Sequence, residues 1–431
     1  MTFENFQSSG PLEMTREQAR EIFEKSIVPA IGAKGPPPKS PTLIVVAGQP
    51  GSGKSTTIRQ AEMGLLGATQ KIISDDFVAW VPGYLGFAKS NPVAATHWAR
   101  KAGSNYFAQE MATRAGNKRA NIIMEFPVPT SFAQHADWYK KLNYRTELHV
   151  VATPHFQSWT GVLDRAEKPL QAGHIGTNVL CPRDAHDQTY AGWARVVFDA
   201  ERYKQVDRIV ITRRDGIIMY DNNLVQQSGG TKSWNKKPQG LECLFLERHG
   251  AVSEDDANTV NEAWKRIVES KYMKKYPYLA TIPLKAYQEE ISGFLDSNGS
   301  RVNIFTKDLS HFDRNAIEQC RKRIISDISI TQDSRKQFGR SVEFDRRVDF
   351  YAQAITSRPV RLTPESESTP HGQADHHDAV AVPGMGIKRK AGELDTPTAS
   401  SEPSGRVVLE RESKRVELQQ LDLRSRSYFN R

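Results

Sequence analysis

Short apolar runs alternate with stretches of helical periodicity through the first half of the chain. The runs that indicate strands are TLIVVAG (42–48), KIISDD (71–76), NIIMEF (121–126), TELHVVAT (146–153) and RIVIT (208–212). The first of them is apolar along its length, as expected for the buried centre of a parallel sheet. Strands that alternate with helices are typical of βαβ units, so the pattern predicts an α/β fold with a doubly wound parallel sheet.

The segment before the first strand has a different pattern. Residues 14–31 carry apolar side chains at helical spacing, and Thr15 could open a capping box, so we expect an amphipathic helix there. The segment 32–41 is rich in Pro and Gly, which cannot continue a helix, and is predicted to be a linker. Residues 1–40 are therefore interpreted as a helix and linker that precede a domain over residues 41–225.

The second half of the chain divides by composition. Residues 225–240 (QQSGGTKSWNKKPQG and its flank) are predicted to be a linker, and residues 241–355 are mainly helical in pattern, with no recognisable motif. From residue 358 to 431 the composition shifts to Pro, Ser, Thr, Glu and His. Such a composition buries too little apolar surface to offset chain entropy, so we expect a largely disordered tail.

Composition narrows the functional classes only partly. The 431 residues carry a formal net charge of +9, which suits a phosphorylated ligand, a nucleic acid or an anionic surface. No run approaches the roughly 18 apolar residues of a membrane span, and the first residues lack a signal-peptide pattern. The three scattered cysteines favour reduced thiols without a metal site. These features predict a cytoplasmic protein, and they leave delivery into another cell open.

A phosphate-binding motif follows the first strand directly. The segment GQPGSGKST matches G-x-x-x-x-G-K-[ST] and consists of Gly48, Gln49, Pro50, Gly51, Ser52, Gly53, Lys54, Ser55 and Thr56. Its glycines let backbone N–H groups approach phosphates, and the following helix N-terminus favours negative charge. Lys54 would reach the β- and γ-phosphates of ATP or GTP, and the Ser55 hydroxyl would bind Mg²⁺. The fold is thus predicted to be of the P-loop NTPase type.

Several landmarks after this motif resemble those of the zeta toxin family. The Gln and Pro inside the loop are typical of that family, and so is an aspartate followed by Phe77 and Pro82, which here is Asp75. The resemblance implies a P-loop kinase that phosphorylates the sugar of UDP-N-acetylglucosamine. It also implies that Asp75 is the catalytic base, with Asp76 as its neighbour in the acceptor site. The residues alone leave open that this pair is a helix cap or a solvated turn.

Two further positions take their roles from the resemblance. Glu125, at the end of the third strand, occupies the place of a family glutamate that faces the acceptor. The family segment Gly-Thr-Gly-Arg that follows is replaced here by Phe-Pro-Val-Pro (126–129), so its acceptor-binding arginine is missing. Arg165 stands where the family has an arginine that acts on the γ-phosphate. A solvent-facing Glu125 and an ordinary helix-surface Arg165 remain the alternatives.

The family carries a second phosphate-binding arginine shortly before a proline-led helix. In this register that position is Val179, and the nearest substitute is Arg183, which follows Pro182. His186, in the same segment, is expected to orient or pack the helix.

Three functions fit these observations. The first is a zeta-like kinase of a nucleotide-sugar hydroxyl, with ATP or GTP and Mg²⁺, toxic to the cell in which it acts and paired with an antitoxin or immunity protein. The second is a kinase of another nucleotide-like acceptor, such as a dinucleotide cofactor or a polynucleotide end. The third is a non-catalytic, nucleotide-gated binding protein, for which Asp75 would be dispensable. The small-molecule acceptor is favoured over nucleic acid as a partner, because short basic clusters in a tail are usually only solvated.

Overall fold

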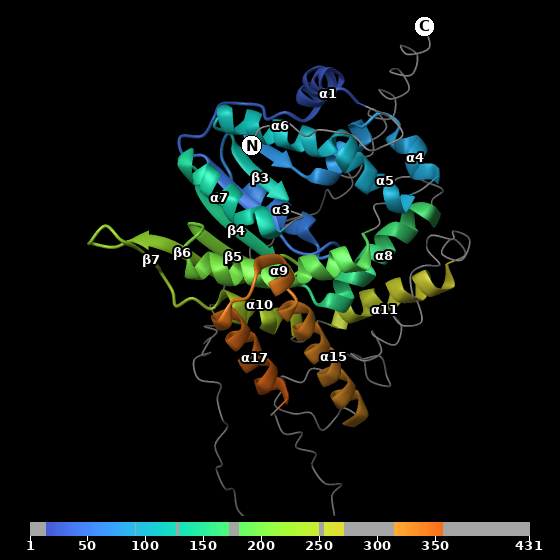
Figure 1. The fold of residues 1–431 in the computed structure, drawn as a ribbon, viewed down its shortest axis with the longest axis vertical. Helices are drawn as coiled ribbons and strands as arrows, with labels where there is room; N and C mark the ends of the chain where they lie inside the picture. The colour runs from blue at the N-terminus through green and yellow to red at the C-terminus, as the bar shows by residue number, and fades with distance from the viewer. Residues whose placement is uncertain are drawn as a thin grey trace, which may run out of the picture. The chain divides into compact units, whose positions relative to one another are not determined.

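The structure is a computed structural model that describes residues 14–90, 92–125, 129–171, 181–249, 254–270 and 314–356. Its centre is a seven-stranded sheet with the strand order β2-β3-β1-β4-β5-β6-β7 (Figure 1). The first five strands in that order pair in parallel, and the last two are antiparallel additions. Their bounds are β1 Thr42–Ala47, β2 Thr69–Ile72, β3 Asn121–Glu125, β4 Arg145–Val151, β5 Arg208–Thr212, β6 Ile218–Gln226 and β7 Lys232–Trp234.

Helices cover both faces of this sheet, which confirms the predicted doubly wound arrangement. Alternate residues of β1 point to opposite faces: Leu43 and Val45 enter the main apolar core, whereas Ile44 and Val46 pack with α3 in a second cluster. The helices and helical turns of this part are α3 Lys54–Met63, η2 Ser74–Trp80, α4 Tyr84–Ser90, α5 Pro92–Ala99, η3 Arg100–Ser104, α6 Asn105–Asn117, η4 Pro129–Ser131, α7 Phe132–Lys141, α8 His155–Gln171 and α9 Arg183–Arg202.

The N-terminal helix forms as predicted, with one irregularity. It consists of α1 Arg16–Ile22, a π-helical turn η1 Phe23–Ile27 and α2 Val28–Ile31. The Thr15 side chain accepts from the backbone N–H of Gln18, whose own side chain accepts from the Thr15 N–H, so the capping box is present.

Two strand predictions need correction. The segment 71–76 is not a strand to its end: β2 stops at Ile72, and a 3₁₀ helix begins at Ser74. The predicted linker 225–240 contains the end of β6 and all of β7, which form a hairpin at the sheet edge. Most residues of β6 are only half-buried, so its sequence IMYDNNLVQ lacks the apolar run that marks the central strands.

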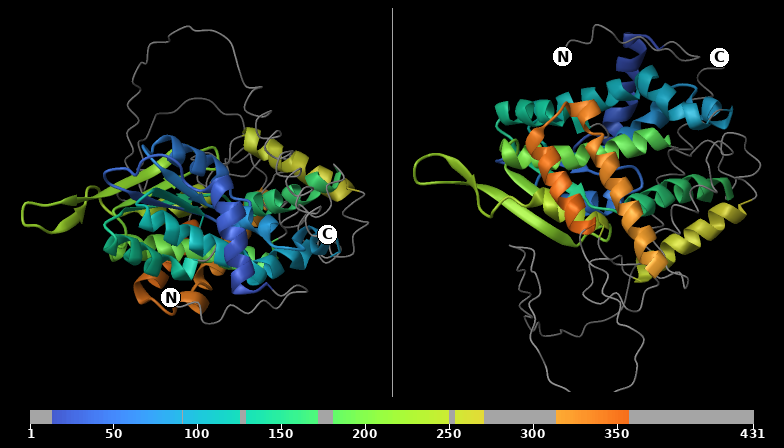
Figure 2. Two further views of the ribbon diagram at one scale, coloured as in Figure 1. Left: turned by 90° about the horizontal axis from the view of Figure 1, so that it is seen from above. Right: turned by 60° about the horizontal axis from the view of Figure 1, so that its bottom comes forward.

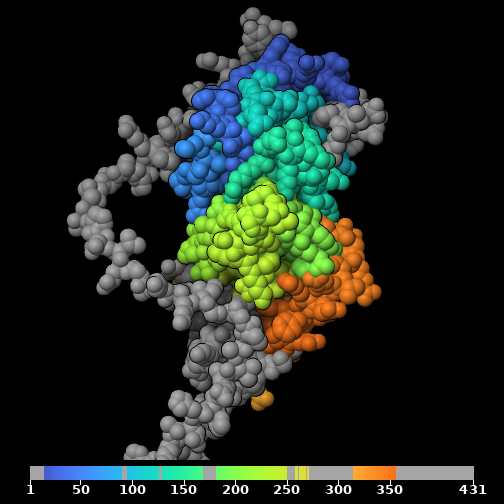
Figure 3. Space-filling model, turned by 90° about the vertical axis from the view of Figure 1, so that its left-hand side faces the viewer, coloured from blue at the N-terminus to red at the C-terminus, as the bar shows by residue number. Residues whose placement is uncertain are grey.

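Helices after residue 239 pack against the helices of the sheet domain. They are α10 Gly240–His249, α11 Glu254–Glu269, α15 Arg314–Gln332, α16 Arg335–Phe338 and α17 Val342–Thr356. α10 and α15 pack on α9, and α11 packs on α8 (Figures 1 and 2). In the space-filling view the orange C-terminal helices lie directly against the green part of the surface (Figure 3). Residues 271–313 of the predicted helical region and the predicted disordered tail 358–431 lie outside the described residues.

A buried cation marks this helical interface. Arg248 of α10 is 1% exposed, and its guanidinium carbon lies 3.9 Å from the centre of the Tyr190 ring on α9. Burial lowers the pKa of Arg248 and raises that of Tyr190. Phe198 of α9 and Phe344 of α17 meet edge to face at 5.5 Å, and an ion pair between Arg202 and Glu343 joins the same two helices.

Glu147 provides a test of how the central strands are held together. It is 6% exposed, and burial alone would raise its pKa, but hydrogen bonds from His149 and Arg145 and the charge of Arg208 lower the pKa to about 2. Because the folded-state pKa is depressed, this stabilisation is complete above the unfolded-state pKa near 4.5 and is lost as the pH falls towards 2. We expect Glu147→Gln to lower the free energy of unfolding by about 3 kcal/mol at pH 7.

Urea denaturation of both proteins between pH 7 and pH 2.5 measures this difference. The gap between wild type and Glu147→Gln should narrow steadily below pH 4.5. A gap that stays constant with pH would show that the charge of Glu147 contributes nothing.

Candidate active site

The predicted phosphate loop joins β1 to α3 and has the backbone that the motif requires. Gly48, Gly51 and Gly53 have φ angles of 145°, 77° and 94°, a region that side chains with a Cβ rarely occupy. Gly53 is the N-cap of α3, so the loop leads directly into a helix N-terminus. The loop is therefore built to present backbone N–H groups to an anion.

Lys54 lies inside this loop and meets Glu125. Its Nζ donates to the carbonyl oxygens of Gly48 and Gln49, each at 3.0 Å, and lies 3.3 Å from Glu125 Oε1. The lysine side chain is 10% exposed. The sheet order explains the pair, because β3 neighbours β1 and places Glu125 opposite Val46, two residues before the loop. Glu125 therefore faces the phosphate loop, not open solvent.

The N-terminal part of α8 packs tightly on the other side of the loop. The Gln49 side chain is fully buried and donates to the Thr153 carbonyl oxygen (2.8 Å) and to Ser158 Oγ (3.1 Å). Thr153 Oγ1 in turn donates to the Ser52 carbonyl oxygen (2.7 Å). A Cβ at Gly51 would clash with the Ser158 carbonyl oxygen. The loop is thus fixed by α8 as well as by its own turn.

Sequence reasoning missed Arg214, which also holds the loop. Its Nη1 donates to the Gly51 carbonyl oxygen at 2.6 Å, and it follows β5, whose carboxyl end lies at the same sheet edge. A cationic residue just after a parallel strand of a doubly wound sheet lies at the ligand crevice. The position of Arg214 directly after the predicted fifth strand could therefore have identified it.

The close approach at Gly51 leads to a prediction. Gly51→Ala should weaken ATP binding by about tenfold or more, because the new methyl group collides with α8 and the residue must keep a positive φ. Calorimetric titration with ATP measures the change. Gly64→Ala at the end of α3 is the matched control, since its φ is −85° and the nearest atom to an added Cβ is 3.7 Å away. Equal ATP affinity in the two variants would contradict the described packing.

Asp75 lies in the 3₁₀ helix η2, not on a strand. Its Oδ1 accepts from Arg100 Nη2 at 2.9 Å, with about a third of each side chain exposed. Asp76 is exposed, so the two carboxylates of the pair have different surroundings. Arg100 was not found from the sequence, because it lies 25 residues away in the π-helical turn η3.

Cys181 shows that separate parts of the predicted site converge. Burial raises the pKa of its thiol to about 11, the charges of Arg100, Arg165 and Lys54 act to lower it, and that of Asp75 acts to raise it. The charges of these four groups therefore act on the same thiol. They come from η3, α8, the phosphate loop and η2. Lys54, Asp75 and Arg165, predicted from three separate motifs, therefore lie in one region.

The side chains next to Arg165 and at Arg183 are engaged elsewhere. Arg165 itself is exposed on α8, and its neighbour Asp164 accepts from Arg266 of α11 at 2.9 Å. Arg183 Nε donates to both carboxylate oxygens of Asp187, at 3.0 and 2.8 Å. Arg183 thus forms an ion pair within α9. To contact a phosphate as predicted, its guanidinium would have to bind the phosphate and Asp187 at the same time.

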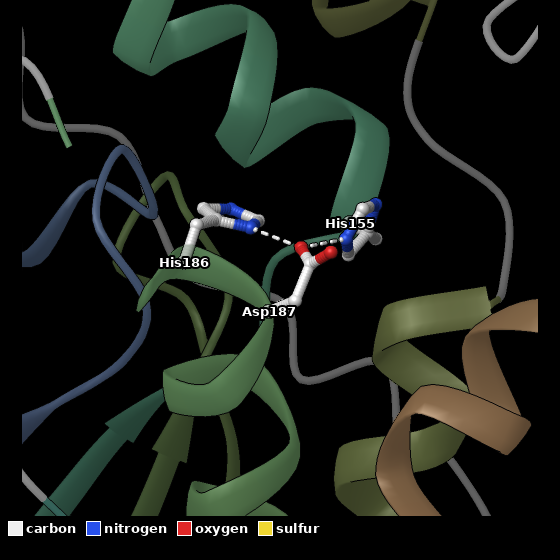
Figure 4. Close-up of side chains that lie close together, drawn as sticks. All are labelled: His155, His186 and Asp187. Atoms are coloured by element: carbon white, nitrogen blue, oxygen red, sulfur yellow. Dashed lines mark hydrogen bonds and ion pairs between the residues drawn. The ribbon is translucent and has the colours of Figure 1, made fainter. Parts of the chain in front are cut away.

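Two histidines gather around Asp187 at the starts of α8 and α9. His155 Nε2 lies 2.6 Å and His186 Nδ1 lies 2.9 Å from Asp187 Oδ1, as Figure 4 shows. Both imidazoles are fully buried. The other ring nitrogen of His186 lies 2.9 Å from Ser158 Oγ, so this cluster is connected to the phosphate loop.

A sequence model of the zeta toxin family matches residues 30–225. This segment is similar to zeta toxins. Toxin zeta of Streptococcus agalactiae is 24% identical over 186 residues, which are 43% of this chain and 64% of that protein. Toxin zeta of Enterococcus hirae is 25% identical over 187 residues, again 64% of its length, and that of Streptococcus pyogenes is 24% identical over 218 residues, or 75% of its length.

Solved structures provide looser matches. One is that of the PezAT chromosomal toxin–antitoxin system of Streptococcus pneumoniae, with a TM-score of 0.49 and 17% identity over 60% of this chain and 99% of the other. Another is the AvrRxo1-ORF1:AvrRxo1-ORF2 complex with ATP, with a TM-score of 0.36 and 14% identity over 65% and 96% of the two chains.

The segment that matches the zeta toxin family ends before the C-terminal helices begin. The family match stops at residue 225, within β6, whereas α10, α11, α15 and α17 pack on α8 and α9 of that segment. Of the segment that replaces the family's Gly-Thr-Gly-Arg, residues 126–128 lie outside the described residues, and Pro129 starts η4. No helix in the described part of the chain is long and apolar enough to cross a membrane.

Proposed function

We propose that this protein is a kinase that transfers the γ-phosphoryl group of ATP or GTP to a hydroxyl of a small nucleotide-like acceptor. The observation that carries the proposal is the phosphate loop with Lys54 seated 3.3 Å from Glu125, together with the Asp75–Arg100 pair that follows the nearby strand β2. Such a site combines a cradle for phosphates, cations for the charge of the transferred group and a carboxylate to accept a proton. These are the parts that phosphoryl transfer needs.

The proposed reaction is balanced as follows. Asp75 accepts the proton of the acceptor hydroxyl while that oxygen forms a bond to the γ-phosphorus. The bond between the γ-phosphorus and the bridging oxygen of the β-phosphate breaks, so the nucleoside diphosphate leaves and the acceptor becomes a phosphomonoester. Lys54 and Arg165 stabilise the charge on the transferred group, and Arg100 orients Asp75 through the 2.9 Å contact.

The donor set also suits a magnesium ion. Ser55, in the first turn of α3, is exposed, and the Glu125 carboxylate lies beside Lys54 and is 27% exposed. Oxygen ligands of this kind are those Mg²⁺ prefers when it also binds phosphates. Ser55 and Glu125 would hold the ion, which neutralises phosphate charge during transfer. Glu125 is therefore proposed to serve the donor side as well as the acceptor side that the family resemblance implies.

We further propose that the acceptor is a nucleotide sugar such as UDP-N-acetylglucosamine and that the activity is toxic. Support comes from the match to the zeta toxin family and from relatives that are named toxins. On this basis the protein acts in the cytoplasm and is neutralised by an antitoxin protein. The Phe-Pro-Val-Pro segment lacks the arginine expected after Glu125, and this favours a second candidate, a dinucleotide cofactor or a polynucleotide end.

Incubation of the purified full-length protein with γ-labelled ATP, Mg²⁺ and a panel of acceptors tests the proposal. We expect label in a nucleotide sugar and none in oligonucleotides. Label in a dinucleotide or in a 5′ end would select the second candidate. Tight ATP binding without transfer to any acceptor would favour a nucleotide-gated binding protein.

A further inference from the structure

A continuous buried chain of hydrogen bonds connects the phosphate loop to the start of α9. Gln49 Nε2 donates to Ser158 Oγ (3.1 Å), Ser158 Oγ lies 2.9 Å from His186 Nε2, and His186 Nδ1 lies 2.9 Å from Asp187 Oδ1. Gln49, Ser158 and His186 are all fully buried. From Gln49 to His186 the chain is therefore shielded from solvent, and Asp187 at its end is 24% exposed.

The far end of this chain is firmly anchored. Asp187 accepts from both nitrogens around it, His155 Nε2 at 2.6 Å and His186 Nδ1 at 2.9 Å, and from Arg183 Nε at 2.8 and 3.0 Å. Because a carboxylate only accepts, His186 carries its proton on Nδ1, which leaves Nε2 as an acceptor. The single proton of the Ser158 hydroxyl is shared between His186 Nε2 and the His155 carbonyl oxygen, each 2.9 Å from Ser158 Oγ. Burial lowers the pKa of His186 to about 3, which fits this neutral imidazole.

The near end of the chain controls the catalytic lysine. The Gln49 side chain is held by Ser158 and by the Thr153 carbonyl oxygen, and the Gln49 backbone carbonyl oxygen accepts from Lys54 Nζ at 3.0 Å. Any displacement of Gln49 therefore moves a carbonyl oxygen that holds the Lys54 ammonium group in position. Gly51, two residues further along the loop, lies against the Ser158 backbone, where an added Cβ would clash, so the loop has little room to move there.

A metal ion is the other chemistry that His155, His186 and Asp187 could support, since one ligand atom from each lies within 4.8 Å of the others. The charges argue against it. Arg183 already binds both oxygens of Asp187 and brings a full positive charge to the place a cation would occupy. The short contacts of Asp187 Oδ1 to both imidazoles are also those of direct hydrogen bonds.

We propose that His186 is a positioning residue for phosphoryl transfer, which acts through Ser158 and Gln49 to hold the phosphate loop in its ATP-binding geometry. This inference rests on the proposed kinase function. It predicts that loss of either link weakens ATP binding by about three- to tenfold, because a neutral buried hydrogen bond is commonly equivalent to about a fivefold change in an equilibrium constant. The KM for ATP should rise by the same factor, whereas the KM for the acceptor should not.

Four variants separate this role from general packing. Ser158→Ala cuts the chain at α8. His186→Gln places an amide where Nε2 was and keeps the Ser158 contact, whereas His186→Asn keeps only the Asp187 contact. We expect ATP affinity close to wild type for His186→Gln and reduced affinity for His186→Asn and Ser158→Ala. Thr160→Val is the control, because Thr160 is a buried hydroxyl of the same helix that bonds only the Phe156 carbonyl oxygen, at 2.9 Å.

Calorimetric ATP titration together with thermal unfolding gives the outcome. Gln49→Met completes a double-mutant cycle: Ser158→Ala should cost ATP affinity in the wild type and nothing in the Gln49→Met background. Additive effects, or normal ATP binding by folded Ser158→Ala, would overturn the inference. Stoichiometric zinc in the purified protein that is lost in His186→Asn would overturn it in favour of a metal site. Lys54→Ala is included in parallel: if it binds ATP normally, the kinase proposal itself fails.

Discussion

Lys54→Ala is expected to reduce phosphoryl transfer by at least 10²–10³-fold and to weaken ATP binding. Lys54 is the cation seated within the phosphate loop itself, 10% exposed and held by the carbonyl oxygens of Gly48 and Gln49. Its removal deletes the charge that would meet the β- and γ-phosphates and leaves Glu125, 3.3 Å away, without that partner. An uncompensated carboxylate beside the phosphates repels them, which adds to the loss.

Initial rates of labelled transfer and ATP titration measure this effect. Lys71→Ala is the matched control, because it removes the same charge from the protein at a surface ion pair with Glu62, where the lysine is 45% exposed. We expect Lys71→Ala to keep wild-type rates. Full activity of Lys54→Ala would show that the loop does not bind the phosphate donor.

The elements that were predicted correctly are those whose local sequence pattern is sufficient to identify them, without knowledge of what they pack against. β1 and β5 are short apolar runs in the sheet centre, and their predicted positions match the structure to within a residue. The end of β2 was wrong because Ser74 and Asp75 leave the sheet where its neighbour β3 continues. The β6–β7 hairpin was missed because an edge ribbon with half-buried residues has neither a core run nor a strict alternation.

The same division applies to the site. The phosphate loop is a contiguous motif, so its residues and conformation could be predicted from spacing alone. Arg100 and the Ser158–His186 contact could not, because they join positions 25 and 28 residues apart through the packing of whole elements. His186 was expected to pack its helix, and the structure adds that it does so by a hydrogen bond towards the loop. The roles of Asp75, Glu125, Arg165 and Arg183 stay predictions.

Asp75→Asn is expected to lower the rate of phosphoryl transfer by about 10²–10⁴-fold, the usual contribution of a general base, while ATP binding is kept. The substitution keeps the size of the side chain, and the new amide oxygen can still accept from Arg100. It removes only the ability to take a proton from the acceptor hydroxyl. A fall in kcat without a change in the ATP dissociation constant would therefore show that the phosphoryl-transfer step is impaired and that ATP binding is not. If the protein is toxic, toxicity should fall in parallel.

Asp76→Asn is the matched control for this prediction. The sequence suggested that Asp76 differs from Asp75 because the two would alternate on a strand, whereas the structure separates them on a 3₁₀ helix. On a strand the two carboxylates would point to opposite faces, but in η2 they lie about 120° apart around a 3₁₀ helix. Asp75 is turned towards Arg100, whose Nη2 donates to it at 2.9 Å. Asp76 is exposed and makes its backbone bond to Ile73. We therefore expect Asp76→Asn to retain at least half of the wild-type rate, and a loss confined to Asp76→Asn would place the base one residue further along.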